Sequence, residues 1–243
     1  MEHKFEKTEA GVPQGGPLSP LLSNIMLNEL DNELQRRGHK FVRYADDLVI
    51  LCKSKRAAER IMNSVIKFIE EQLFLKVNRD KTSVVYYNQI KFLGYSFYKT
   101  KGETRFRIHP KSIVKLEAKL RVLTSRSNGW GNEKRKSKLS SFIKGWLNYY
   151  KYADIQNLMK RVDEWYRRRL RMIIWKQWKN IKTKWRNLIK LGINKYKAWE
   201  YANTRKSYWR TSKSPILSRS VTNERLKQAG YIFFSDYYKQ VRV

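Results

Sequence analysis

The sequence has few cysteines, few acidic residues and no long apolar run. Cys52 is the only cysteine, which excludes a disulfide framework and a cysteine-ligated zinc module such as a zinc endonuclease. No apolar stretch approaches the ~18–20 residues of a membrane-spanning helix, and the first residues lack the apolar core of a signal peptide. We therefore expect a cytoplasmic, reducing setting and no membrane partner.

The shortage of acidic residues leaves a large positive charge. The 243 residues include 53 lysines and arginines against 21 aspartates and glutamates, a formal charge of +32. A polyanion usually neutralises such self-repulsion, so nucleic acid is the first candidate partner; by charge alone, an anionic membrane surface would be the second. Residues 1–100 carry 16 basic and 12 acidic side chains, whereas residues 101–243 carry 37 and 9 and include all eight tryptophans. A near-neutral first part thus precedes a basic, aromatic second part.

Hydrophobic spacing predicts an α+β fold for the first part. Ser19 and Pro20 form a good helix start, and apolar residues continue at helical spacing toward Gly38. Further patterns predict a helix around residues 61–73 and strands at residues 41–44, 48–52, 83–87, 91–98 and 105–108. From residue 108 onward the patterns are helical only, around residues 113–123 and 142–150 and from about 155 to about 185, so we expect a domain boundary at residues 107 and 108.

The strand pair at residues 41–52 carries two neighbouring carboxylates, Asp46 and Asp47, in its turn. Burying them would cost free energy without a compensating cation. Carboxylate oxygens suit Mg²⁺, and a pair of Mg²⁺ ions is a common device for nucleotidyl transfer. The dipeptide alone is also compatible with a solvated turn between two ordinary strands.

Four ordered motifs give this dipeptide a context. Residues 11–24 read GVPQGGPLSPLLSN, residues 44–47 YADD, residues 78–82 NRDKT and residues 92–95 FLGY. In this order and spacing they resemble the palm of the reverse transcriptases, an antiparallel sheet with helices, over roughly residues 8–98.

The resemblance implies a role for each matching residue. Asp46 and Asp47 would bind catalytic Mg²⁺, with Asp47 as the weaker ligand, and Lys81 would lie near the phosphates of the incoming dNTP. The implied nucleotide- and primer-binding residues are Gln14, Gly15, Tyr44, Phe92, Leu93 and Gly94. Without the motif order, Lys81 could equally be a solvated lysine, and Phe92 and Leu93 plain core residues.

The first part departs from the family pattern in one respect. The family's metal site also needs an aspartate upstream of the loop at residues 11–17, yet none of the ten residues before Gly11 is an aspartate. The fingers must lie upstream as well. We therefore expect little or no polymerase activity from this chain alone. The missing parts could be lost, supplied by a separate polypeptide, or encoded outside this sequence.

The second part offers clustered cations beside aromatic residues. A helical bundle with a solvated basic face would explain the tryptophans as core residues, but solubility alone does not require such an excess of charge. Cations next to aromatic seams suit RNA phosphates and unstacked bases. The candidate RNA-binding residues are Arg161, Arg167, Arg168, Arg169, Arg171, Lys134, Arg135 and Lys136.

Residues 108–185, including GWLNYY at residues 145–150, resemble the maturase-specific domain of group II intron proteins. YWR at residues 208–210 and SPIL at residues 214–217 resemble the C-terminal segment of the bacterial members. The implied domains are a partial palm at residues 1–107, an all-α thumb and RNA-binding domain at residues 108–190, and a C-terminal extension at residues 191–243.

Three hypotheses follow. In the first, the chain belongs to an RNA-directed DNA polymerase that uses intron RNA, a DNA primer or target, and dNTPs. In the second, it is a non-catalytic cofactor that binds intron RNA and promotes splicing. In the third, it is a general nucleic-acid-binding protein with a relic palm. The first two share intron RNA as a partner and differ in whether the carboxylates at residues 46 and 47 act.

Overall fold

The computed structural model describes residues 16–242, and the chain forms two compact units that divide between Phe92 and Leu93. Each unit has a hydrophobic core of its own. The division precedes the expected boundary at residues 107 and 108, because the β-hairpin that ends at Ile108 belongs to the second unit. Among the described residues, no helix is long and apolar enough to cross a membrane.

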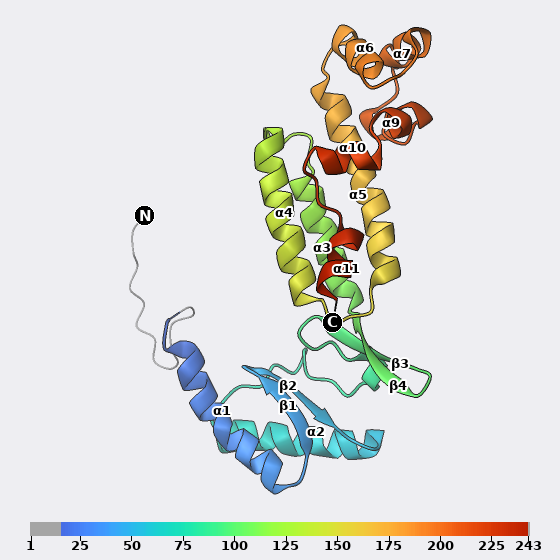
Figure 1. Cartoon of the computed structure of the whole chain (residues 1–243). Helices are drawn as coiled ribbons and strands as arrows, with labels where there is room; N and C mark the ends of the chain where they lie inside the picture. Colours follow the sequence, from blue (N-terminus) through green and yellow to red (C-terminus); the bar gives the residue numbers. More distant parts are fainter. Residues whose placement is uncertain (1–15, 243) are drawn as a thin grey trace, which may run out of the picture. The chain divides into compact units, whose positions relative to one another are not determined.

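The first unit packs two helices against a two-stranded antiparallel sheet (Figure 1). Its core cluster has members from both helices and from the segment that follows them: Leu30, Leu34, Val65 and Leu73. Ser54 caps the second helix by accepting a hydrogen bond from the Ala57 backbone N–H at 3.2 Å. The elements are α1 (Ser19–Arg36), β1 (Lys40–Tyr44), β2 (Asp47–Leu51), α2 (Lys55–Glu71) and the 3₁₀ turn η1 (Tyr87–Gln89).

The structure confirms the predicted hairpin and both predicted helices of this unit. In the hairpin, Phe41 pairs with Ile50 and Tyr44 with Asp47. The predicted strand at residues 83–87 is wrong, because no described strand pairs with these residues and they lead into η1 instead. A run of β-branched and aromatic residues does not form a strand without a neighbour to complete its hydrogen bonds.

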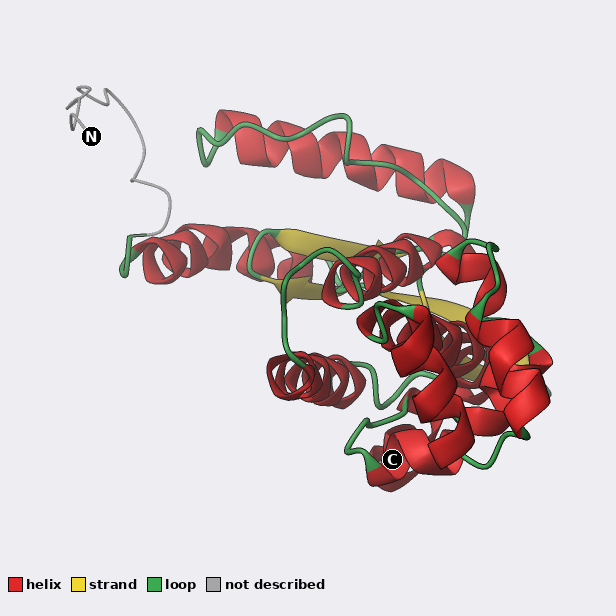
Figure 2. Ribbon diagram, turned by 90° about the horizontal axis from the view of Figure 1, so that it is seen from above, coloured by secondary structure: helices red, strands yellow, loops and turns green. Residues whose placement is uncertain are grey.

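The second unit is a β-hairpin followed by helices (Figure 2). Three long helices and the C-terminal helix share one large core that includes Leu120, Ile143, Tyr166 and Trp175. The elements are β3 (Tyr95–Thr100), β4 (Glu103–Ile108), α3 (Pro110–Leu123), α4 (Asn132–Tyr149), α5 (Gln156–Gln177), α6 (Ile181–Lys190), α7 (Lys195–Ala202), α8 (Tyr208–Thr211), α9 (Pro215–Ser220), α10 (Asn223–Gln228) and α11 (Phe234–Val241).

The single helix expected from about residue 155 to about residue 185 is two helices, α5 and α6. Asn180 separates them: its side chain accepts a hydrogen bond from the Thr183 backbone N–H at 2.8 Å and caps α6. Apolar residues keep helical spacing across the break, so hydrophobic periodicity alone did not reveal it. The predicted strand at residues 91–98 likewise begins late, at Tyr95, because Leu93 and Gly94 both have positive φ, +51° and +80°.

A buried carboxylate holds the C-terminal helix on α5. Asp163 accepts hydrogen bonds from the backbone N–H groups of Phe234 and Ser235, each at 2.8 Å, and from the Ser235 hydroxyl at 2.5 Å. Burial raises the pKa of this carboxyl, and the hydrogen bonds act against that shift. The contact caps α11 at its first turn, where the N–H groups have no partner within the helix.

Replacing Asp163 should therefore destabilise the second unit. Asp163→Ala leaves the buried Phe234 N–H without its partner, and we expect a loss of about 2–4 kcal/mol in the free energy of unfolding. Chemical denaturation followed by circular dichroism measures it. The matched control is Asp236→Ala, which removes an exposed ion pair with Lys227 and should cost about 1 kcal/mol or less. Equal losses in the two variants would contradict the assigned role of Asp163.

The turn before β3 is built for a residue without a side chain. A Cβ at Gly94 would lie 2.4 Å from the Tyr150 hydroxyl oxygen and 3.1 Å from Ser112 Oγ. The Gly94 carbonyl accepts hydrogen bonds from the His109 N–H at 3.0 Å and from Ser112 Oγ at 3.2 Å. Residues at the start of α3 and at the end of α4 thus pack against this turn.

Gly94→Ala should lower the stability of this unit through steric overlap as well as backbone strain. Gly102→Ala is its matched control, since Gly102 also has positive φ, +83°, but has no atom within 4 Å of an added Cβ. We expect a loss of about 1 kcal/mol for the control and about 2–4 kcal/mol for Gly94→Ala, measured by thermal unfolding. Similar losses would show that the turn tolerates a side chain.

Candidate functional site

The two carboxylates lie at the tip of the β1–β2 hairpin. Ala45 and Asp46 form a two-residue turn in which Ala45 has φ +52°, as the first position of a type II′ turn requires. Asp47 begins β2 opposite Tyr44, and all four residues are exposed. A non-glycine residue with positive φ costs about 1–3 kcal/mol, so the surrounding structure must hold this turn.

Arg43 is the residue that holds it. Its Nη1 donates to the Ala45 carbonyl oxygen and to Asn24 Oδ1, each at 3.0 Å. On the other side, its Nε donates to Asp31 Oδ1 at 2.8 Å and its Nη2 to Asp31 Oδ2 at 2.5 Å. The Asp31 carboxylate raises the pKa of Arg43. Arg43 thereby ties the turn to α1, a role that sequence reasoning missed because Asn24 and Asp31 are distant in the chain.

Asp46 and Asp47 are the right kind of ligands for Mg²⁺, because carboxylate oxygens are hard donors. Within residues 16–242, however, no group of three or more histidine, cysteine, aspartate or glutamate residues lies close enough to hold a metal ion. The described residues therefore fit one side of a magnesium site. Its other ligands would have to come from substrate phosphates, water or residues beyond this range.

The remaining palm motifs occupy two further turns. Lys81 is exposed, and its N–H donates to Asn78 Oδ1 at 3.2 Å in a turn that the 2.5 Å Arg79–Glu70 ion pair ties to α2. Phe92 ends the first unit, and the turn of Leu93 and Gly94 begins the second. Gln14 and Gly15 lie outside the described residues.

Two tyrosines fix the Leu93 turn. The Tyr149 hydroxyl donates to the Leu93 carbonyl oxygen at 2.8 Å, and the Tyr95 hydroxyl donates to the Tyr149 carbonyl oxygen. Burial, together with neighbouring tyrosines, raises the pKa of Tyr95 to about 12. The GWLNYY motif of α4 therefore supports the turn that the resemblance assigns to the primer terminus.

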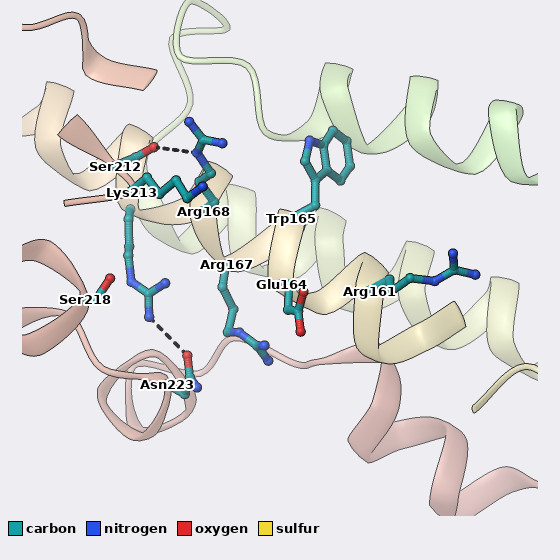
Figure 3. Close-up of a pocket in the computed structure, with 10 residues that line it drawn as sticks. Arg161, Glu164, Trp165, Arg167, Arg168, Ser212, Lys213, Ser218 and Asn223 are labelled. Atoms are coloured by element: carbon teal, nitrogen blue, oxygen red, sulfur yellow. Dashed lines mark hydrogen bonds between the residues drawn. The ribbon is translucent and has the colours of Figure 1, made fainter. Parts of the chain in front are cut away.

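An open groove of about 450 Å³ runs beside α5 in the second unit (Figure 3). One wall is α5, and the other is formed by residues between the end of α8 and the start of α10. We call it the arginine groove, because five cations and a single carboxylate line it: Arg161, Arg167, Arg168, Arg171, Lys213 and Glu164.

Two arginines of this groove, Arg168 and Arg171, donate to neutral partners. Arg168 lies over the Trp209 ring at 3.7 Å from its centroid and donates to the Trp209 carbonyl at 3.1 Å. Arg171 donates to the Val221 carbonyl at 2.9 Å and to Asn223 Oδ1 at 3.1 Å. Burial, aided by nearby Arg167, lowers the pKa of Arg171. These contacts position the guanidinium groups without neutralising them, which leaves their charge available to an anion.

The other candidate RNA-binding residues have different surroundings. Arg135 is only 2% exposed and donates to Asn128, so its predicted contact with RNA is not possible in this structure. Arg169 donates to the Thr124 hydroxyl and to the Arg121 carbonyl, where it caps the end of α3. Lys136 pairs with Glu133 at 2.6 Å, and Lys134 is exposed. Sequence reasoning missed Lys213 and Asn223, which only the fold brings beside α5.

Comparison with known proteins gives two family matches in sequence order. Residues 2–97 match the family "Reverse transcriptase (RNA-dependent DNA polymerase)", and residues 113–192 match "Group II intron, maturase-specific domain". The first match spans the carboxylate hairpin. The second spans α4, α5 and α6 and contains every arginine of the groove.

Three curated relatives align with parts of the chain. The chain is 33% identical to Protein YkfC of Escherichia coli (strain K12) over 139 residues, 42% of this chain and 36% of that protein. It is 40% identical to Retron Mx65 reverse transcriptase of Myxococcus xanthus, over 29% of this chain and 17% of that protein. It is 22% identical to the Putative COX1/OXI3 intron 2 protein of Saccharomyces cerevisiae (strain ATCC 204508 / S288c), over 62% of this chain and 28% of that protein.

The chain thus spans about a third or less of the length of these curated relatives. The two family matches nevertheless cover most of the chain, in the order that the palm and maturase motifs predict, and the intron protein aligns with more than half of it. On this evidence the chain combines a reverse transcriptase region with a group II intron maturase-specific domain, in that order.

Proposed function

We propose that the chain binds structured intron RNA through the arginine groove and promotes its splicing. We further propose that Asp46 and Asp47 supply part of the metal site of an RNA-directed DNA polymerase, which extends a DNA primer with dNTPs. The groove is the observation that carries the proposal, since five cations and a single carboxylate line it and all its arginines fall within the maturase-specific match.

The groove suits a phosphate backbone better than a small ligand. It is open along one side of a helix, and its arginines come from different turns of α5, so they can meet different phosphates of one strand. Trp165 adds an apolar surface beside them. Neutralising phosphates releases counterions, which makes affinity strong at low salt and steeply salt-dependent. The rest of the basic second unit reinforces this attraction at long range.

The metal part of the proposal assigns different tasks to the hairpin residues. Asp46 and Asp47 would hold Mg²⁺, while Arg43 would keep their turn in one conformation through the Ala45 carbonyl. Bound Mg²⁺ would stabilise charge on the transferring phosphate. RNA binding in the groove involves neither carboxylate, so a splicing function does not depend on polymerisation.

An exposed apolar stripe on α1 supports a further polypeptide as a partner of the first unit. Its members lie at helical spacing on one side of the helix: Leu18, Leu21, Leu22, Ile25 and Met26. Contiguous apolar side chains on a protein surface usually mark an interaction site. We assign the stripe to the additional polymerase segment that would complete the metal site.

Removing cations from the groove should weaken RNA binding and its salt dependence together. We expect Arg161→Gln combined with Lys213→Gln to raise the Kd for the host intron RNA about tenfold and to reduce the salt slope by about two. Lys101→Gln, in the β3–β4 turn away from the groove, is the control. Filter binding across a salt series measures both quantities, and an unchanged slope in the groove variant would contradict the proposal.

The hairpin should bind a divalent ion in solution. Fe²⁺ can replace Mg²⁺ at oxygen sites, and with ascorbate and peroxide it cleaves the nearby backbone. We expect cleavage within a few residues of Asp46 in the wild-type chain and about a tenfold reduction in Asp46→Asn with Asp47→Asn, because the ligand charge is lost. Intron RNA affinity should stay within about twofold.

Asp80→Asn is the matched control, since it removes an exposed carboxylate from a turn of the same unit. Mass spectrometry of the fragments locates the cuts. Cleavage that persists near residue 46 in the double variant would show that these carboxylates do not hold the ion.

A further inference from the structure

Helix α7 carries two aromatic rings that the core does not use. It packs against α6 at the end of α5 opposite the β3–β4 hairpin (Figure 1). On α7, Ala198 and Ala202 are buried, whereas Tyr196 is 89% exposed and Trp199 is 56% exposed. Residues three apart on a helix lie on the same side, so the two rings form an aromatic platform on the surface, defined by Tyr196 and Trp199.

The structure holds part of this platform in place. Trp185 of α6 meets Trp199 edge to face, with ring centroids 6.2 Å apart and an interplanar angle of 89°. The indole N–H of Trp185 also donates to the Lys195 carbonyl at 3.4 Å, at the first turn of α7. Trp199 therefore keeps a fixed orientation while more than half of it stays exposed. Fixing an aromatic ring before binding lowers the entropy cost of stacking on it.

The surroundings of the platform are strongly basic. Residues 181–206 contain eight lysines and arginines and one acidic residue, Glu200. Lys195 and Lys197 flank Tyr196 in sequence, and both are exposed. Exposed rings among cations are the combination that binds single strands, because bases stack on the rings while phosphates meet the cations.

We propose that the aromatic platform binds unpaired nucleotides of RNA, as a second site that differs in chemistry from the arginine groove. Bases in a duplex already stack on one another and cannot lie on Tyr196 or Trp199. The arginine groove, in contrast, does not require unpaired bases. The choice of RNA over DNA rests on the proposed function. The platform would therefore select a single-stranded loop or end of the same RNA whose backbone the groove binds.

Two other occupants are less well matched. A helix that lies in a membrane surface needs a broad apolar face, but α7 is eight residues long and its exposed side includes Glu200 beside the rings. A protein partner that buries such rings would need acidic residues to match the eight cations. Unpaired RNA supplies both bases that stack on the rings and phosphates that match the cations.

The test compares single-stranded and double-stranded RNA on the intact chain. Fluorescence anisotropy gives the Kd for a labelled 12-nucleotide oligouridylate, which stacks poorly on itself, and for a 12-base-pair RNA duplex. We expect Tyr196→Ala to weaken oligouridylate binding about tenfold and duplex binding less than twofold. Tyr196→Phe, which keeps the ring, should bind as the wild type does. Because Tyr196 is so exposed, the unfolding temperature should not change.

Tyr152→Ala is the matched control, since Tyr152 is also exposed, at 57%, and has the Lys151 ammonium over its ring at 5.0 Å. It should leave both affinities unchanged. Equal weakening of single strand and duplex in Tyr196→Ala, or no weakening of either, would overturn the proposal. Tighter binding of oligothymidylate DNA than of oligouridylate, or ring-dependent binding to vesicles with anionic lipid, would overturn the RNA assignment.

Failure of this inference and failure of the proposed function give different results. The arginine groove variants are tested on intron RNA and duplex RNA, whereas Tyr196→Ala is tested on oligouridylate and is not expected to change duplex affinity. If the groove variants bind normally while Tyr196→Ala loses oligouridylate, the proposed function fails and the aromatic platform stands.

Discussion

Helix α5 buries one side in the core and carries charged residues on another side. The packing of the second unit depends on this division. Met159, Tyr166, Leu170 and Ile173 are buried in the core, while Arg161, Arg167 and Arg168 line the arginine groove. Asp163 adds a third requirement, because it holds α11 against α5. Packing, capping and charge thus share one 22-residue helix, and a change in its rotation would disturb all three.

The basic residues of the second unit divide into those that build the fold and those that face solvent with their charge available. Arg135 donates to Asn128 in the loop between α3 and α4, and Arg169 donates to the Arg121 carbonyl near the end of α3. Arg168 belongs to both groups, since it stacks on Trp209 and still lines the groove. An excess of cations in the sequence therefore overstates the number that can meet RNA, and only the fold separates the two groups.

Sequence reasoning predicted the elements whose partners lie nearby in the chain. The β1–β2 hairpin followed from alternation and a short turn, and most helices followed from apolar spacing. It could not show that residues 83–87 lack a neighbouring strand. Nor could it show that the cap at Asn180 starts a new helix although apolar residues keep helical spacing past the end of α5. For the site, it named the carboxylates and all four groove arginines by motif and clustering. It could not identify Arg43 or Lys213, whose partners are distant in sequence, and it could not tell buried Arg135 from its exposed neighbours.

The central claim is that intron RNA lies in the arginine groove. Modification of arginines with phenylglyoxal, read by mass spectrometry with and without the host intron RNA, tests it most directly. The account predicts that RNA protects Arg161 and Arg167, while Arg135 reacts slowly in both states because it is buried. Equal reactivity of Arg161 and Arg167 with and without saturating RNA would contradict the account.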